Sequence, residues 1–122
     1  MEIKSTVTAI GPKALSDEDP MVILFDESAS EALRQVAIIQ QFGDPAHQEK
    51  LHVQSGDQLS IDGQHFKIHE VGSLVNENLR TIGHVTLIFS DKGPSDLQNA
   101  LYFAEGTKPE FHVGTQIIYT TK

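Results

Sequence analysis

Four short segments in the first half of the chain resemble four segments in the second half, in the same order. Matching segments lie 58 to 64 residues apart. A half of about 60 residues buries too little surface to be stable alone, so two copies would close one core together. The general similarity of strands and turns is the alternative explanation. The matches are Val7–Gly11 with Ile68–Gly72, Met21–Phe25 with Val85–Phe89, Val36–Phe42 with Leu97–Phe103, and Gly56–Ile61 with Gly114–Tyr119.

Most of the chain has the pattern of short β-strands. In the run Leu59–Ile68, Asp62 and Gly63 separate two alternating stretches. Both residues tolerate positive φ, so they predict a tight hairpin. We predict an all-β fold, a closed or nearly closed barrel, because closure removes exposed strand edges. Residues 1–122 would form one domain from two similar halves, a repeat over 3–61 and 64–119. Further strands are expected at 3–10, 22–25, 36–42, 85–89, 97–103 and 113–119.

Helical signals are few and short. Ser28 and Glu31 are spaced as in a capping box, which predicts a turn of helix through Arg34. Residues 76–80 are a second short candidate, which Gly83 would stop. The acidic stretch 15–20 is expected to be a surface loop.

Charge and composition exclude several classes of function. The net charge is −8 with no offsetting Lys/Arg stripe, so nucleic-acid binding is not expected. The absence of cysteine excludes disulfides, thiolate catalysis and Cys-ligated zinc. No apolar run approaches the ~20 residues that span a bilayer, and the N-terminus lacks a signal-peptide core, so we expect a cytoplasmic protein. An acidic surface favours basic protein partners, although solubility alone also explains it.

Histidines are the only side chains here suited to acid–base or nucleophilic chemistry near neutral pH. No Ser/His/Asp pattern, P-loop or Gly-rich dinucleotide motif accompanies them. His65 and His69 share the solvent face of a predicted strand, too far apart to bind one metal. His47 and His52 lie in a polar loop that no acidic ligand pattern frames, and His112 has no supporting context. We therefore expect no metal site.

His84 has the best local context for a site. It follows Gly83 at the start of the predicted strand 85–89, and a glycine there lets a ligand or another backbone approach closely. Arg80, in the preceding helical turn, could pair with a phosphate through two hydrogen bonds. A histidine that only hydrogen-bonds to a neighbouring loop is the alternative.

The run Asn78–Phe89 resembles the signature segment of the glucitol/sorbitol-specific IIA components of the bacterial phosphoenolpyruvate-dependent sugar phosphotransferase system. Ser5–Gly11 and Met21–Ala29 resemble the N-terminal half of that family. Gly56–Leu59 resembles its mid-chain glycine turn. The similarity spans almost the whole chain, and the family's barrel-like all-β fold agrees with the expectation from the repeat.

The resemblance implies a phosphoryl carrier. A family member takes a phosphoryl group from the phosphocarrier protein HPr onto a histidine, then passes it to the IIB part of a permease. It implies HPr and the IIB/IIC permease subunits as partners, contact with the membrane only through the permease, and no metal or organic cofactor. Histidine suits this role because a neutral imidazole offers a ring-nitrogen lone pair near pH 7.

One position departs from the family. Its phosphorylated histidine aligns with Gln40, and a second family histidine aligns with Phe42. A carboxamide nitrogen is neither basic nor nucleophilic, because its lone pair is delocalised into the carbonyl. Either the chain is a working carrier with a substitute histidine, His84 first and His47 second, or it is a divergent paralogue without phosphotransfer, acting as a binding or regulatory module. A small-ligand barrel unrelated to sugar uptake is a third option.

Overall fold

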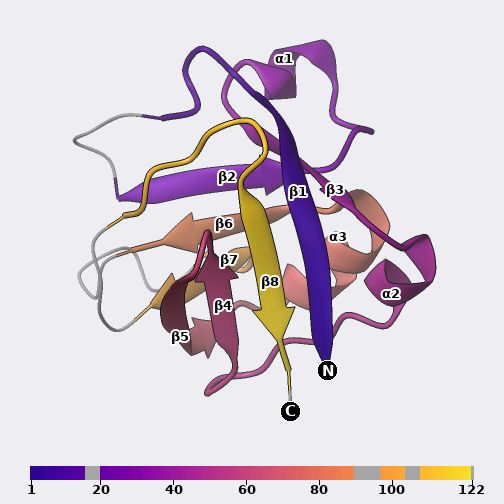
Figure 1. Ribbon diagram of the computed structural model, residues 1–122, viewed down its shortest axis with the longest axis vertical. Coiled ribbons are helices and arrows are strands. Elements are labelled where there is room, and N and C mark those ends of the chain that lie inside the picture. Colours follow the sequence, from indigo (N-terminus) through magenta and orange to yellow (C-terminus); the bar gives the residue numbers. More distant parts are fainter. Residues whose placement is uncertain (16–19, 90–96, 104–107, 122) are drawn as a thin grey trace.

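Eight strands close one barrel within the residues that the computed structural model describes, 1–15, 20–89, 97–103 and 108–121 (Figure 1). The order around the barrel is β1-β3-β2-β6-β7-β5-β4-β8. The predicted closed all-β barrel is therefore confirmed. The strands are β1 (Glu2–Ile10), β2 (Met21–Phe25), β3 (Ile38–Phe42), β4 (Gln58–Ile61), β5 (Gln64–Val71), β6 (Val85–Ile88), β7 (Ala100–Phe103) and β8 (Gln116–Thr120).

The β4–β5 hairpin forms as predicted. Asp62 has φ 49° and Gly63 has φ 85°, which are the left-handed conformations that a two-residue turn of this kind needs. Within β5, Phe66 points into the core while His65 and His69 are exposed. The predicted solvent face of this strand is confirmed.

In the part of the chain that the structure describes, three short helices cover the barrel, α1 (Glu31–Arg34), α2 (Pro45–Glu49) and α3 (Val75–Ile82). The predicted cap of α1 was wrong, because Ser30 accepts the hydrogen bond of the Leu33 N–H at 3.2 Å. Ser28 instead bonds to the carboxylate of Asp26. Helix α3 ends as predicted at Gly83, which has φ 61°.

Helix α2 falls in a segment that was expected to be a loop. Asp44 caps it by accepting the Ala46 N–H at 2.9 Å, and Pro45 occupies the first turn, where its missing N–H does no harm. None of the three helices is long and apolar enough, within the described residues, to cross a membrane. The acidic stretch 15–20 lies mostly outside the described residues.

The strand pairings of the first half of the chain are repeated in the second half, with β1 to β4 corresponding to β5 to β8. β1 pairs with β3 as β5 pairs with β7, and β2 runs parallel to β3 as β6 does to β7. The antiparallel pairs β2–β6 and β4–β8 join the two halves. The register shifts after Val7 in β1 and after Ile68 in β5, which are corresponding residues.

Single hydrogen bonds also match between the halves. The Gly11 N–H donates to the Ala37 carbonyl at 3.0 Å, and the Gly72 N–H donates to the Ala100 carbonyl at 2.9 Å. A glycine with positive φ precedes both β4 and β8, Gly56 at 95° and Gly114 at 99°. These contacts pair Ala37 with Ala100, so the β3 and β7 segments correspond at an offset two residues larger than the sequence match of Val36–Phe42 with Leu97–Phe103. The repeat over 3–61 and 64–119 stays a prediction, which the matching contacts support.

Candidate functional site

Gln40 of β3 is fully buried, and its amide takes part in three hydrogen bonds. Ser5 of β1 donates its hydroxyl to Gln40 Oε1 at 2.6 Å, and Tyr119 of β8 donates to the same oxygen at 2.8 Å. Gln40 Nε2 donates to the carbonyl of Gly83 at 2.9 Å. We call Ser5, Gln40 and Tyr119 the polar triad.

The folding of the chain around Gly83 brings this carbonyl to Gln40. With φ 61°, Gly83 turns the backbone from α3 into β6, and a Cβ at this position would lie 2.7 Å from the Cβ of Asp26. A larger residue would therefore displace the carbonyl that Gln40 contacts. At the oxygen end of the Gln40 amide, burial raises the pKa of the Tyr119 phenol, so the phenol stays protonated and remains a hydrogen-bond donor.

Gln40 belongs to the lining of a cleft of about 270 Å³. The Asp26 carboxylate accepts the Ser28 N–H at 2.9 Å, which fixes one wall. Among the residues that the structure describes, the lining contains two carboxylates and no Lys or Arg, so it disfavours an anionic phosphoryl group. It comprises Asp26, Glu27, Ser28, Gln40, Gln41, Phe42, Pro45 and Gln48.

His84 lies in a contact network of its own. Its ring stacks on Phe25 with centroids 4.1 Å apart, and Nδ1 lies 3.0 Å from the Leu24 carbonyl oxygen. Nε2 lies 2.8 Å from Asn99 Nδ2. These partners fit a neutral ring that donates from Nδ1 and accepts at Nε2. Desolvation lowers the His84 pKa, although the Leu24 carbonyl opposes it, so the neutral form is favoured at pH 7.

The other two expected site residues also have separate environments. The side chain of His47 on α2 is 55% exposed, and its Nε2 lies 3.7 Å from the Asp44 carboxylate. Arg80 donates from Nη1 to the Leu51 carbonyl at 3.2 Å. None of His84, His47 and Arg80 lines the cleft that contains Gln40. Gln40 contacts the carbonyl of Gly83, the residue before His84, but the side chains of His84, His47 and Arg80 make their hydrogen bonds and ion pairs with other partners.

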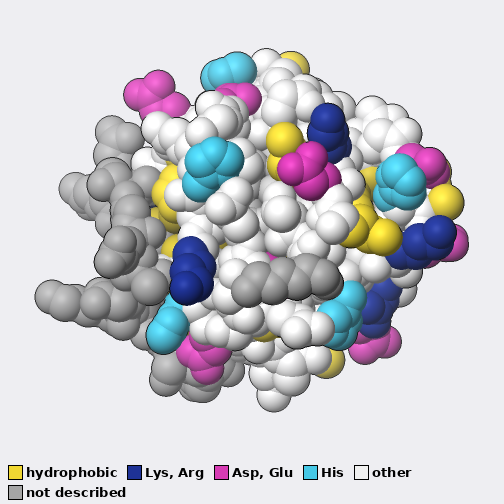
Figure 2. Space-filling view, turned by 60° about the horizontal axis from the view of Figure 1, so that its bottom comes forward, with side chains coloured by type: hydrophobic (Ala, Val, Ile, Leu, Met, Phe, Trp, Pro, Cys, Tyr) yellow, Lys and Arg dark blue, Asp and Glu magenta, His cyan; other side chains and the backbone are white. Residues whose placement is uncertain are grey.

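The other histidines do not form a cluster either. Figure 2 shows histidine side chains scattered over the displayed face of the molecule. No group of three or more His, Asp or Glu residues within the described part of the chain could hold a metal ion.

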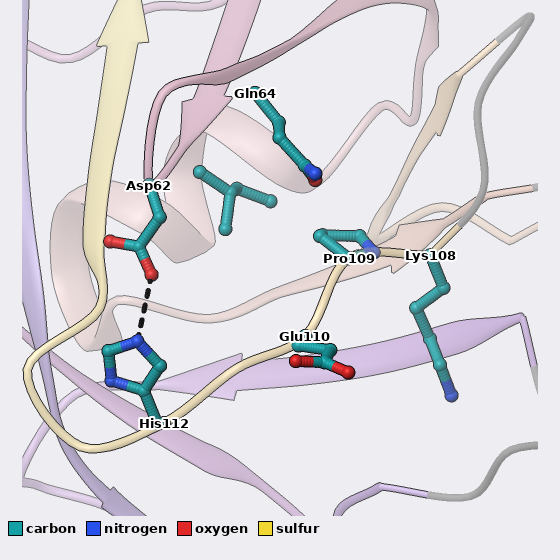
Figure 3. A pocket seen from close by; sticks show the side chains of 7 residues that line it. Asp62, Gln64, Lys108, Pro109, Glu110 and His112 are labelled. Atoms are coloured by element: carbon teal, nitrogen blue, oxygen red, sulfur yellow. Dashed lines mark ion pairs between the residues drawn. The ribbon is translucent and has the colours of Figure 1, made fainter.

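A second hollow of about 470 Å³ lies between the β4–β5 turn and residues 108–112 (Figure 3). Asp62 Oδ2 lies 3.2 Å from His112 Nε2, and Asp62 Oδ1 accepts the Gln116 N–H at 2.9 Å. The bond from Gln116 is the main reason that the Asp62 pKa is lowered. This hollow shares no lining residue with the Gln40 cleft, so it does not extend that site.

Sequence reasoning missed Ser5 and Tyr119 as partners of Gln40. The available signal was the alternation of β1, in which Ser5 stands between the inward-facing Ile3 and Val7. A small polar residue in an inward position predicts a buried hydrogen bond. Its partner could not be predicted, because Tyr119 follows Ser5 by more than a hundred residues.

Comparisons with known proteins agree on one family. The family described as "PTS system glucitol/sorbitol-specific IIA component" matches residues 2–118. The PTS system glucitol/sorbitol-specific EIIA component of Escherichia coli (strain K12) is 30% identical over 102 residues, which cover 83% of this chain and 80% of that protein. The protein of the same description from Shigella flexneri matches equally. The crystal structure of a PTS system IIA component from Enterococcus faecalis V583 is 38% identical, with a TM-score of 0.87 over 97% of this chain and 99% of that one.

Proposed function

Because this chain belongs to the family of glucitol/sorbitol-specific IIA components of the phosphotransferase system, we propose that it binds the family's partner proteins without itself carrying a phosphoryl group. Its partners would be the phosphocarrier HPr and the IIB/IIC permease subunits, and it would act with HPr in the cytoplasm. It would be a binding or regulatory module that engages HPr without discharging it.

The observation that carries this proposal is the environment of Gln40. The residue aligned with the family's phosphorylated histidine has no lone pair on nitrogen with which to attack phosphorus. Its oxygen already accepts hydrogen bonds from Ser5 and Tyr119, and its nitrogen donates to Gly83. Because both its oxygen and its nitrogen are hydrogen-bonded within the protein, the Gln40 amide is suited to a fixed structural role and not to accepting a phosphoryl group temporarily.

His84 is a poor substitute acceptor. The Nε2 lone pair that would attack phosphorus already faces Asn99, and the Nδ1 proton faces the Leu24 carbonyl. Phosphorylation at Nε2 would break the Asn99 contact and place a charged group beside a half-buried ring stacked on Phe25.

A second candidate function is phosphoryl transfer through His47. Two observations favour it, the exposure of His47 and the contribution of Pro45 and Gln48, its neighbours on α2, to the cleft lining. In that reaction a ring nitrogen of His47 would form the new N–P bond while the N–P bond of phosphorylated HPr breaks. HPr would keep the electron pair of the broken bond.

The test incubates the native chain with radiolabelled phosphoenolpyruvate, enzyme I and HPr and measures the label on each protein. In parallel, calorimetry measures the affinity of the native chain for HPr. We expect labelled HPr, an unlabelled chain and measurable HPr binding. Acid-labile label on the chain would contradict the proposal. His47→Ala then tests the second candidate function, because the variant will carry no label if His47 is the phosphoryl acceptor. His65→Ala is the matched control and should keep its label. An unlabelled chain that also fails to bind HPr would equally contradict the proposal.

A further inference from the structure

Asp62 and Gly63 form the only Asp-Gly or Asn-Gly step in the sequence, and they occupy the turn between β4 and β5. In such a step the glycine nitrogen can attack the carboxyl carbon of the preceding side chain, because glycine has no Cβ to hinder the approach. The product is a five-membered succinimide ring, which water opens to aspartate or to isoaspartate. The turn therefore contains a peptide bond that can rearrange without an enzyme.

The attacking nitrogen is unhindered in this turn. The Gly63 N–H makes no hydrogen bond within the residues that the structure describes, so no native contact of this group has to break before it reacts. A Cβ built on Gly63 would have no atom within 4 Å, so the space around the residue is open. Both Asp62 and Gly63 are exposed to water. The nucleophile of the rearrangement is therefore free.

The carboxyl group of Asp62, in contrast, is held by another part of the chain. Its Oδ1 accepts the Gln116 N–H at 2.9 Å, and its Oδ2 lies 3.2 Å from His112 Nε2, as the dashed line in Figure 3 shows. The Asp62 N–H also donates to the Gln116 carbonyl at 2.9 Å. Ring closure would make the planar carboxyl carbon tetrahedral and expel one of its oxygens. It must therefore break at least one of the two side-chain contacts.

The same contacts keep the Asp62 carboxyl ionised. The Gln116 N–H is the main cause of its lowered pKa, and the His112 ring lowers the pKa further. An ionised carboxylate resists attack by a nitrogen lone pair, because its negative charge repels the electron pair and its oxygen cannot leave as water. The folded chain thus presents a free nucleophile beside a restrained and deactivated electrophile.

We propose that the Asp62-Gly63 step is a latent site of isoaspartate formation, which His112 and the first residue of β8, Gln116, keep closed in the folded chain. In the open state the Gly63 nitrogen forms a bond to Cγ of Asp62, and the bond from Cγ to one carboxyl oxygen breaks. That oxygen leaves as water with the Gly63 N–H proton and the proton of the neutral carboxyl group.

Water alone completes the modification. It adds to the backbone carbonyl carbon of Asp62, the bond from this carbon to the Gly63 nitrogen breaks, and the nitrogen regains a proton. The main chain then runs through the former side chain. One water is lost and one is taken up, so the mass of the chain does not change and no oxidant, metal or co-substrate takes part.

The modified turn would no longer fit its surroundings. Isoaspartate adds one carbon atom to the main chain of a turn that joins paired residues, Ile61 of β4 and Gln64 of β5. The Gln116 N–H would also lose the acceptor that Asp62 supplies at the start of β8. We therefore expect the isomerised chain to unfold at a lower urea concentration than the native chain.

The test incubates the native chain near neutral pH, with and without urea sufficient to unfold it, and measures isoaspartate at position 62 over time. Peptide mapping with electron-transfer fragmentation distinguishes the two isomers, which have the same mass. We expect the folded chain to isomerise at least about tenfold more slowly than the unfolded chain. Equal rates in the two states would overturn the proposal, and so would isoaspartate that forms faster at another aspartate of the unfolded chain.

Variants of His112 test its part in the protection. His112→Ala should speed isomerisation in the folded state by about two- to fivefold, as expected for the loss of an exposed ion pair. His112→Gln should stay close to the native rate, because its amide can still donate to Asp62. The matched control is His65→Ala, on the neighbouring strand β5, which should keep the native rate.

Urea unfolding of each variant shows that it is folded under the conditions of the incubation. His112→Phe provides a second variant that keeps a ring and lacks the donor, and it should isomerise as fast as His112→Ala. If folded His112→Ala or His112→Phe isomerises at the native rate, His112 does not protect the turn and the proposal is wrong.

Discussion

The hydroxyl of Tyr119 donates a 2.8 Å hydrogen bond to the side-chain oxygen of Gln40, a residue 79 positions earlier in the chain. The last strand of the barrel thereby fixes the orientation of the Gln40 amide, the residue that the resemblance aligns with the family's phosphorylated histidine. The bond persists at any physiological pH, because burial raises the pKa of the phenol.

A carboxylate at position 40 should be poorly tolerated. Gln40→Glu replaces the amide nitrogen that donates to the Gly83 carbonyl by an oxygen, so two acceptors would face each other in a buried site. We expect a loss of about 2–4 kcal/mol in the free energy of unfolding at pH 7. The loss should shrink as the pH falls toward 4–5, because a buried carboxyl binds a proton more readily than an exposed one.

The matched control for that substitution lies next along β3. Gln41 is exposed, so Gln41→Glu should change the free energy of unfolding by no more than about 0.5 kcal/mol. Urea titrations of the two variants at several pH values make the comparison. Equal effects at positions 40 and 41 would contradict the hydrogen-bonding scheme.

His84 should make the stability of the protein depend on pH. Its pKa is lowered in the folded chain from an ordinary value of 6.5. The unfolded chain therefore binds the proton first as the pH falls, and protonation favours unfolding. The stability that His84 contributes should be complete above about pH 7 and be lost as the pH falls through 6.5 to its lower folded pKa.

Urea unfolding between pH 7.5 and about 5 measures this dependence, with His84→Gln as the test variant and His65→Gln as the control. His65 is exposed on β5 and so serves as the control for replacing a histidine that lies outside the core. A His84→Gln variant with the native slope would show that His84 is protonated equally in both states.

Two glycines should be equally indispensable if the halves of the chain are equivalent. A Cβ on Gly11 would lie 2.0 Å from the Arg34 carbonyl oxygen, and a Cβ on Gly72 would lie 2.3 Å from the Gln98 carbonyl oxygen. Alanine at either position should destabilise the fold by about 2–4 kcal/mol, because backbone must move. Gly43→Ala is the control, since no atom lies within 4 Å of its added Cβ. Thermal unfolding of the three variants tests this prediction. If alanine is tolerated at only one of positions 11 and 72, the result would count against the repeat.

The barrel was predictable because its signals are local. The Asp62-Gly63 turn, the alternation in β5 and the glycine stop at Gly83 each depend on a few neighbouring residues, and all three were found as expected. The α1 cap failed because Ser28 and Ser30 are both capable caps, and the capture of Ser28 by Asp26 is a contact that spacing does not reveal.

The candidate site was much less predictable. Its polar triad joins β1, β3 and β8, so no short stretch contains the pattern. His84 had a promising context beside a glycine, yet its two ring nitrogens are directed at Leu24 and Asn99 instead of the cleft. The direction of a side chain at a strand end depends on contacts from distant segments, and sequence spacing carries no information about those contacts.

The most direct test of the central claim is the intact mass of the native chain after incubation with phosphoenolpyruvate, enzyme I and HPr, recorded at neutral pH to preserve phosphohistidine. We predict a chain of unchanged mass beside fully phosphorylated HPr, because the amide of Gln40 cannot accept the group. A chain heavier by one phosphoryl group would contradict the account.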